Sequence, residues 1–416
     1  MTKFIILKDL KSNLRAFGAW ILKRMETRHR ISVFLLTVLS FCSCNGQLAD
    51  KNSRFFDKDQ DIYIAGDENN TATYWKNGEA VRLTDLNNFS HASGIAVFGN
   101  DVYVSGYKTN NKDAVYESGS SQHTVVTDSK NKVPQRNGTI AGYWKNKKFM
   151  DITDGTVNAE ASSIAVIGND VYVAGYECDG QKAASGSDDL NNAVAKYWRN
   201  GQPVVLTDGI NVARATSVAV KNSDVYVVGY EQLGQNQSKE LRYWKNGKRI
   251  NIKIDKNIGH GSDYSEAYSV FVVGNDVYIA GAESGLATYW KNGNPVKLID
   301  PIKSQPGQVD NIIVSKASSI VVNGTDVYVA GTQDTLASMN TVAKFWKNGK
   351  PLSLTHAPED LKSNVFIALS GKNACLAYSL ADKSDKRTAR IWKHGLTKIL
   401  SDKVTEVNAL VIVKHL

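Results

Sequence analysis

The sequence predicts an all-β fold, a seven-bladed β-propeller with four antiparallel strands in each blade. Two recurring phrases carry this prediction: a YWKNG-like string occurs seven times beyond residue 60, and a DVYVAG-like string occurs six times with a decayed seventh copy. Units of about 50 residues with β-branched and aromatic runs between turn residues are typical of propeller blades. The chain is 42% apolar and 22% charged, which is a globular composition that can bury a core.

Each repeat unit contains four short strand patterns, which we name A to D. In the third unit they are SIAV (163–166), DVYVAG (170–175), AKYWRNG (195–201) and VVLTD (204–208). The C-to-D junction reads Lys-Asn-Gly or a variant of it. Asn and Gly tolerate the positive φ angles of a tight hairpin turn, so we expect a two-residue turn there.

Seven of the eight tryptophans occupy one position of strand C. They are Trp75, Trp144, Trp198, Trp244, Trp290, Trp346 and Trp392. Both faces of a propeller blade are covered by neighbouring blades, so adjacent residues such as Tyr197 and Trp198 can both be buried, one on each side. We interpret the tryptophans as packing residues, with an aromatic sugar platform as the alternative.

The two ends of the repeat predict how the ring closes. The first unit begins at strand B with Asp61 and has no strand A, whereas VNALVIV (407–413) matches strand A and has no strands after it. We therefore expect the C-terminal strand to complete the N-terminal blade, which removes the open sheet edges of a linear array. The predicted propeller covers residues 61–416.

The N-terminal 43 residues have the features of a secretory signal peptide. A basic segment precedes the apolar run ISVFLLTVLSF, which is short for a bilayer span, and small residues and cysteines follow. Cys44 after Ser43 resembles the lipobox of bacterial lipoproteins, of the looser Bacteroidetes type. This resemblance implies lipidation of Cys44, a tether over 44–60 and an exported, outer-membrane lipoprotein of the cell envelope; full secretion is the alternative. If translation begins at Met25, the basic segment METRHR before the apolar run has the length usual in signal peptides.

Charge and motif content exclude several function classes. The formal net charge is +9, but residues 1–43 contribute eight basic and two acidic residues, so about +3 remains for the propeller and we expect no nucleic-acid partner. The sequence has no HExxH, GxSxG, Walker or GxGxxG motif, and Cys178 and Cys375 lie in different repeats. We therefore expect no cofactor and no metal site.

The variable connections all lie on one face of the predicted propeller. B-to-C loops are longest at 108–139 and 176–192, and loops on a rigid scaffold commonly carry binding sites. On this face the chain enters strand A near the mouth of the central channel. The residues aligned there are His91, Glu160, Arg214, Glu266, Lys316, Ser363 and Glu406. Polar groups around an opening form a candidate ligand-binding mouth, and solvated residues without a ligand are the alternative.

Aromatic and acidic residues follow strand B on the same face. Tyr107, Tyr176 and Tyr230 are candidates for the same rim, with Glu177, Glu231 and Glu283 after or near them; alternatively, all of these only begin the loops.

The repeats resemble those of uncharacterised β-propeller lipoproteins with VYVAG and YWKNG phrases. We expect a monomeric propeller, anchored to the membrane by lipid, that binds a glycan, peptide or protein on the loop-rich face without catalysis. A scaffold subunit of an envelope assembly and a polysaccharide-acting enzyme are the alternatives, because propellers host all three roles.

Overall fold

The structure, a computed structural model, describes residues 55–85, 89–109, 138–178, 192–234, 238–254, 264–298, 314–335, 340–352, 361, 364–381 and 386–415. All of the strands belong to the compact unit Lys58–Leu416. The signal segment, Cys44, Ser363 and most of the two long B-to-C loops lie outside these residues. No helix in the described ranges is long and apolar enough to cross a membrane.

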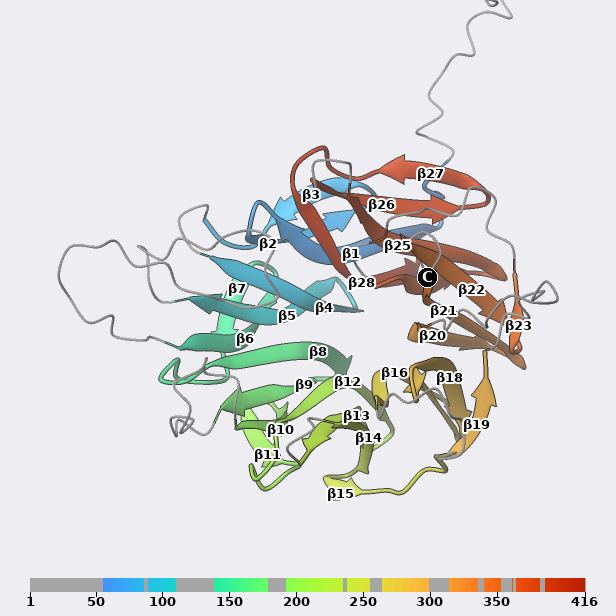
Figure 1. The fold of residues 1–416 in the computed structure, drawn as a ribbon. Coiled ribbons are helices and arrows are strands. Elements are labelled where there is room, and N and C mark those ends of the chain that lie inside the picture. The colour runs from blue at the N-terminus through green and yellow to red at the C-terminus, as the bar shows by residue number, and fades with distance from the viewer. Residues whose placement is uncertain are drawn as a thin grey trace, which may run out of the picture. The chain divides into compact units, whose positions relative to one another are not determined.

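The strands form seven four-stranded antiparallel sheets, which are the blades (Figure 1). Blade 1 contains β28 (Thr405–Lys414), β1 (Gln60–Glu68), β2 (Thr71–Lys76) and β3 (Glu79–Arg82). Blade 2 contains β4 (Ser90–Phe98), β5 (Asp101–Thr109), β6 (Thr139–Lys145) and β7 (Lys148–Asp151). Blade 3 contains β8 (Ala159–Ile167), β9 (Asp170–Cys178), β10 (Ala193–Arg199) and β11 (Gln202–Val205). Blade 4 contains β12 (Ala213–Lys221), β13 (Asp224–Leu233), β14 (Ser238–Lys245) and β15 (Lys248–Arg249).

Blade 5 contains β16 (Glu266–Val273), β17 (Asp276–Glu283), β18 (Leu286–Lys291) and β19 (Asn294–Lys297). Blade 6 contains β20 (Ser315–Asn323), β21 (Asp326–Thr335), β22 (Asn340–Lys347) and β23 (Lys350–Pro351). Blade 7 contains β24 (Phe366–Ser370), β25 (Asn373–Ala381), β26 (Arg387–Lys393) and β27 (Leu396–Ile399). The predicted fold class, a propeller of seven four-stranded blades, is therefore confirmed.

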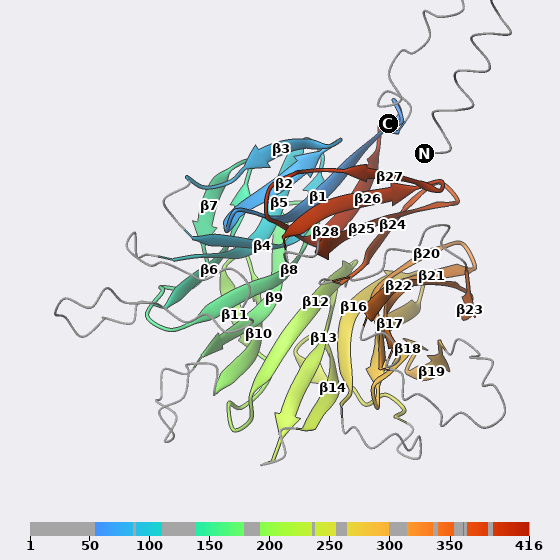
Figure 2. The same ribbon diagram turned by 45° about the horizontal axis from the view of Figure 1, so that its top comes forward.

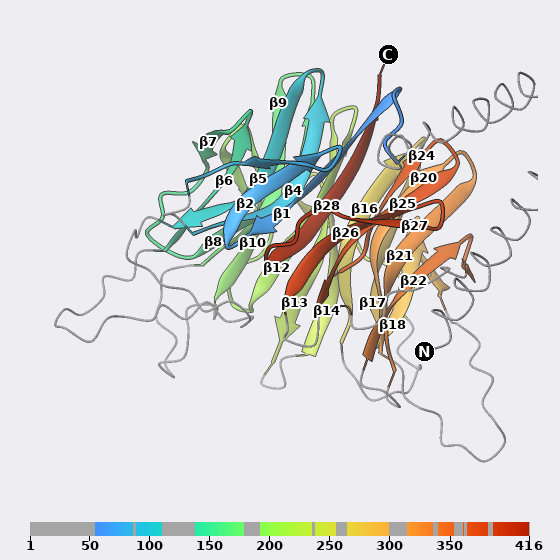
Figure 3. The same ribbon diagram turned by 90° about the horizontal axis from the view of Figure 1, so that it is seen from above.

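The ring closes as the sequence predicts. The C-terminal strand β28 pairs antiparallel with β1 along its whole length, from Gln60 opposite Lys414 to Glu68 opposite Thr405. In Figures 2 and 3 the dark red β28 lies beside the blue β1. Blade 1 is thus built from both ends of the propeller unit, and its sheet has the same strand order as the other six.

Adjacent blades pack through the aromatic residues of strand C. Trp198 is 1% exposed and packs with Tyr103 of blade 2, whereas its neighbour Tyr197 packs with Val218 and Trp244 of blade 4. Six of the repeated tryptophans are at most 1% exposed, and Trp392 is partly buried. A sugar platform needs an exposed ring, so the packing interpretation accounts for these residues.

The turns of the uniform face contain a hydrogen-bonded clamp that the sequence analysis did not anticipate. In blade 3, Asn200 of the C-to-D turn has φ 51°, its Oδ1 accepts from the Val171 amide at 2.8 Å, and its Nδ2 donates to Asp170 at 2.7 Å. Arg199 adds an ion pair to Asp170 at 2.8 Å. The same Asp–Asn pair occurs in Asp61–Asn77, Asp101–Asn146, Asp224–Asn246, Asp276–Asn292 and Asp326–Asn348. The Asp of DVYVAG and the Asn of YWKNG therefore join strand B to the C-to-D turn.

The glycine that ends DVYVAG positions the innermost strand. In blade 3, a Cβ on Gly175 would lie 1.9 Å from the carbonyl oxygen of Glu160, so only glycine allows this approach of β8 to β9. At the same place β8 contains a β-bulge between Ala161 and Ser163. The glycines at the corresponding positions, each facing the carbonyl of the aligned residue, are Gly66, Gly106, Gly229, Gly281 and Gly331. Bulges re-aim the side chains around them, and here they lie where strand A begins.

We expect Gly175→Ala to lower the free energy of unfolding by about 2–3 kcal/mol, because the backbone of Glu160 must move away from the added methyl group. Gly168→Ala in the same blade is the control. Its position has open space and φ 58°, so the cost is about 1 kcal/mol from the backbone conformation alone. Chemical denaturation measures both values, and equal losses in the two variants would contradict the close-contact explanation.

Candidate ligand-binding mouth

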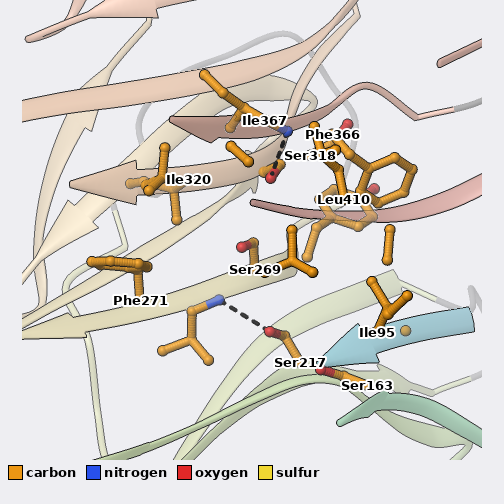
Figure 4. A pocket seen from close by; sticks show the side chains of 18 of the residues that line it. Ile95, Ser163, Ser217, Ser269, Phe271, Ser318, Ile320, Phe366, Ile367 and Leu410 are labelled. Carbon is orange, nitrogen blue, oxygen red and sulfur yellow. Dashed lines mark hydrogen bonds between the residues drawn. The ribbon is translucent and has the colours of Figure 1, made fainter. Parts of the chain in front are cut away.

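The seven innermost strands surround a central cavity of about 610 Å³. Serine hydroxyls and aliphatic side chains line it, as Figure 4 shows for Ser163, Ser217 and Ile320. Several of the serines join neighbouring blades, since Ser163 Oγ accepts from the Val218 amide at 3.3 Å and Ser217 Oγ accepts from the Val270 amide at 3.2 Å. The channel wall is therefore held by side chains between strands of different sheets.

Six of the aligned candidates occupy equivalent places at the start of the innermost strands. We call this set the mouth ring: His91, Glu160, Arg214, Glu266, Lys316 and Glu406. Their cross-strand partners are Tyr107, Tyr176, Tyr230, Ala282, Thr332 and Asp67, in the same order. The sequence alignment of these positions therefore corresponds to one level of the propeller, immediately before the bulge of each strand.

Each mouth-ring side chain interacts with the preceding blade. Four of the interactions are hydrogen bonds: His91 with Asp67, Glu160 with Ser93, Glu266 with Lys239 and Glu406 with Arg387. Two are contacts of a cation with an aromatic ring: Arg214 with Tyr176 and Lys316 with Tyr268. These residues therefore form contacts between blades. Neither of the two sequence-based interpretations, a ligand-binding mouth or solvated residues, predicted these contacts.

His91 of the mouth ring has a strongly raised pKa. Burial is the largest single effect and favours the neutral form of His91, but the carboxylates of Asp67, Glu160 and Glu406 together outweigh it and raise the pKa of His91 to about 9. His91 Nδ1 lies 2.5 Å from Asp67 Oδ2, while Asp67 Oδ1 accepts from the Ala92 amide at 2.9 Å. At neutral pH the imidazole is therefore a cation.

With His91 charged, the mouth ring alternates in sign around the channel. From blade 1 to blade 6 the order is Glu406, His91, Glu160, Arg214, Glu266, Lys316. Each charge has neighbours of opposite sign, which lowers the electrostatic energy of the ring. The ring itself is close to neutral, so it provides no strong field for a polyanion or a polycation.

The Arg214 guanidinium lies over an aromatic ring. Its carbon atom is 4.4 Å from the centre of the Tyr176 ring, and its Nε is buried with no hydrogen-bond partner. Burial raises the pKa of Tyr230 to about 12, even though the Arg214 cation opposes that rise. Burial likewise raises the pKa of Tyr176, so both phenols are protonated at neutral pH.

Glutamate 266 is the centre of a saturated cluster. It is 3% exposed, and its carboxylate accepts from Lys239 at 2.5 Å, from Tyr268 at 2.5 Å and from Tyr264. The sequence analysis missed Lys239, Tyr264 and Tyr268. The pattern Tyr-x-Glu-x-Tyr over 264–268 was the available signal, because alternate residues of a strand share a face.

The last two residues of the mouth ring, Lys316 and Glu406, form fewer hydrogen bonds than Glu266 does. Burial lowers the pKa of Lys316, and no hydrogen bond to its ammonium is present in the part of the chain that the structure describes. Burial raises the pKa of Glu406, although His91 and Arg387 oppose the shift. Arg387 Nη1 donates to the Glu406 carboxylate at 3.2 Å.

The acids that follow strand B face their own blades. Glu177 pairs with Lys196 at 2.5 Å, Glu231 pairs with Arg242 at 2.7 Å, and Glu283 pairs with Lys297. These side chains tie strands of one sheet together. Tyr107 is 3% exposed and lies against His91, with ring centres 5.3 Å apart, so it is a buried packing partner of the mouth ring.

Across the described ranges, no group of three or more His, Cys, Asp or Glu side chains is arranged to hold a metal ion.

Comparisons with known proteins reach only the level of fold. No protein-family model and no curated protein matches the sequence. A structure from a study of two prolyl endopeptidases is similar over 92% of this chain and 56% of that one, with 11% identity and a TM-score of 0.43. This chain thus spans little more than half of that protein.

Two glycoside hydrolases are similar at lower scores. A thermostable family-43 enzyme shares 12% identity over 58% of this chain and 92% of its own, with a TM-score of 0.31. The Bombyx mori GH32 β-fructofuranosidase shares 7% identity over 79% and 88%, with a TM-score of 0.30. Similarities of this size carry no information about a ligand or a reaction.

We expect the stability contribution of His91 to depend on pH. The folded pKa of about 9 exceeds the unfolded value near 6.5, so the contribution is complete below about pH 6.5 and is lost as the pH rises through about 9. The difference corresponds to about 3 kcal/mol. Denaturation of the wild type and of His91→Gln near pH 6 and pH 10 measures it, and a difference between the two proteins that stays constant with pH would refute the ion pair.

Proposed function

We propose that the protein is a non-catalytic binding protein of the bacterial cell envelope that takes a glycan, peptide or protein ligand at the mouth ring. The observation that carries this proposal is the mouth ring itself. Its charged side chains share one register level, two positions before the residues of the same strands that line the central cavity. Tyr176 and Tyr230 are buried beside this level, and a few placed charged groups next to a cavity are the arrangement expected of a binding module.

The engagement of the carboxylates favours binding over catalysis. Asp67 accepts hydrogen bonds from the Ala92 amide and lies against His91, and Glu266 accepts from three donors. A carboxylate that is held in this way is a poor nucleophile or base, because its charge is already stabilised. Most acids of the mouth therefore serve the scaffold.

A polysaccharide-acting enzyme is the second candidate, and Glu406 is the observation that favours it. Its raised pKa suits a general acid, and it lies opposite Asp67 across the β28–β1 pair. Glycoside hydrolysis also needs a second carboxylate on the other side of the scissile bond. Glu160, whose described hydrogen bond is from Ser93 at 3.2 Å, is the available partner.

We also propose that Cys44 is lipidated and anchors the propeller to the envelope, on the resemblance of the sequence around it to a lipobox. Cys44→Ala should move the protein from the detergent phase to the aqueous phase in a phase-separation assay, because the anchor is lost. Cys42→Ala is the matched control and should leave the partition unchanged. Aqueous partition of the wild type would contradict the anchor.

The ligand proposal predicts that a mouth variant loses ligand-induced stabilisation. A ligand that binds only the folded state raises the melting temperature, by an amount equivalent to about 2.7 kcal/mol at one hundred times its Kd. We would screen envelope glycans and peptidoglycan fragments, and use pulldown from envelope extracts for protein partners. Lys316→Gln should weaken binding by about tenfold or more, because a charge-assisted contact is removed.

Lys221→Gln is the control for this experiment. Lys221 lies at the far end of an innermost strand, where its ammonium donates to the Gly274 carbonyl at 2.5 Å. Binding that falls equally in both variants, or in neither, would refute the mouth as the site. Turnover of a bound glycan that is abolished by Glu406→Gln would establish the enzyme instead.

A further inference from the structure

Arginine 214 has hydrogen-bonding capacity that the described protein does not use. Its Nε is buried without a partner, and no hydrogen bond or ion pair joins its guanidinium to another described residue. In the described part of the chain, four indole nitrogens are also buried without a partner, those of Trp75, Trp144, Trp346 and Trp392, but Arg214 differs from them because it carries a charge. A charged group without an acceptor costs more than a neutral one, so Arg214 is the donor for which a ligand acceptor matters most. Arg214 lies over the ring of Tyr176 and is the cross-strand partner of Tyr230, and the hydroxyls of both tyrosines form no hydrogen bond within the described ranges.

The guanidinium is fixed before any ligand arrives. Tyr176 of blade 3 holds it at 4.4 Å from the ring centre, and the backbone of Arg214 is held opposite Tyr230 in the β12–β13 pair. A guanidinium has planar donors that match the two oxygens of a carboxylate. The contact with Tyr176 restricts the side chain, which reduces the conformational entropy lost on binding.

The charges around Arg214 favour a single negative charge on the ligand. Glu160 and Glu266 precede and follow it in the mouth ring. Glu266 is neutralised locally by Lys239, whereas Glu160 is bonded only to a neutral hydroxyl among the described residues. A monoanionic carboxylate is compatible with this balance, whereas a doubly charged phosphate would be repelled by Glu160.

The level below the mouth ring favours a polyhydroxylated ligand. The bulge residues of six blades all carry a hydroxyl or an amide and line the cavity: Ser93, Ser162, Thr216, Tyr268, Ser318 and Asn408. Most of these groups already hydrogen-bond within the protein: Ser93 donates to Glu160, Thr216 to the Val228 and Ala267 carbonyls, Tyr268 to Glu266, Ser318 to Asn364 and Asn408 to the Ala92 carbonyl. Their oxygens can still accept, so they suit a ligand with hydroxyl groups that donate. An acidic peptide would supply the carboxylate but would meet these hydroxyls with fewer matching groups.

We infer that Arg214, with the hydroxyls of Tyr176 and Tyr230, binds the carboxylate of an acidic saccharide of the uronate type whose hydroxyls face the bulge residues. This inference rests on the proposed function, because it assigns a ligand class to the mouth ring.

The test is calorimetric titration of the full-length protein with oligogalacturonate, with its methyl ester and with a hexaglutamate peptide. The wild type should bind the free acid at least tenfold more tightly than the ester. Arg214→Gln should remove that preference, and Arg214→Lys should restore it in part, because the charge returns without the planar fork. Tyr176→Phe should weaken binding of the acid less than Arg214→Gln does.

Arg199→Gln is the matched control variant. Arg199 lies 5.6 Å from the Tyr172 ring centre at the opposite end of blade 3, so its loss should leave binding unchanged. Melting curves of all variants establish that they are folded.

Three results would overturn the inference: equal affinity for acid and ester, binding of the acid that Arg214→Gln leaves intact, or preference for the peptide. Failure of the inference and failure of the proposed function remain distinct. If the ester binds and Lys316→Gln weakens it, the mouth is a binding site without a carboxylate subsite. If no saccharide binds and the wider screen finds no ligand, both fail.

Discussion

The burial of both faces of every blade is the constraint on which the propeller depends. Tyr197 and Trp198 are sequence neighbours, but Tyr197 packs against the following blade and Trp198 against the preceding one. Burying an aromatic side chain of about 200 Å² stabilises the fold by about 5 kcal/mol at most. A blade that lost one neighbour would expose such a face, so closure by β28 and β1 protects the two blades that a linear array would leave uncovered.

The innermost strands add a second constraint, which positions the mouth. Six glycines allow strand A to approach strand B so closely that a Cβ would overlap a carbonyl oxygen at 1.8–2.1 Å. Blade 7 has Tyr378 at this place, and its described strand β24 begins at Phe366. In the six blades whose mouth-ring residue is described, the glycine faces the carbonyl of that residue, so the two positions form one structural unit. The glycine at the end of the DVYVAG phrase therefore fixes the position of the mouth-ring residue opposite it.

Much of the fold was available from the sequence because every blade repeats the same contacts. The strand order, the closure by residues 407–413 and the common level of His91, Glu160 and Arg214 all follow from aligning copies of one phrase. The alignment could not give the charge of His91, because that depends on Asp67 in the preceding blade. It also missed Lys239 and Tyr264 around Glu266, and it left open whether Glu177 faces the rim, because the partner Lys196 lies on another strand. Contacts unique to one blade are invisible to an analysis based on what the blades share.

The charged side chains of the mouth ring differ in whether the protein itself supplies their partners, and this difference distinguishes structural residues from candidate binding residues. An alternating ring of charges could be only a device for joining blades, and for His91, Glu266 and Glu406 the partners in neighbouring blades are sufficient to explain the charge. Arg214 and Lys316 differ, because each lies half-buried against a tyrosine of the preceding blade without an acceptor among the described residues. Keeping a cation partly out of water without an ion pair costs stability that a structural role would not require. Arg214 and Lys316 lie on either side of Glu266, whose charge Lys239 neutralises, so the side of the mouth formed by blades 4 to 6 has net positive charge available to a ligand. On the other side, His91 and Glu406 are paired with Asp67 and Arg387, and Glu160 is bonded only to the Ser93 hydroxyl among the described residues.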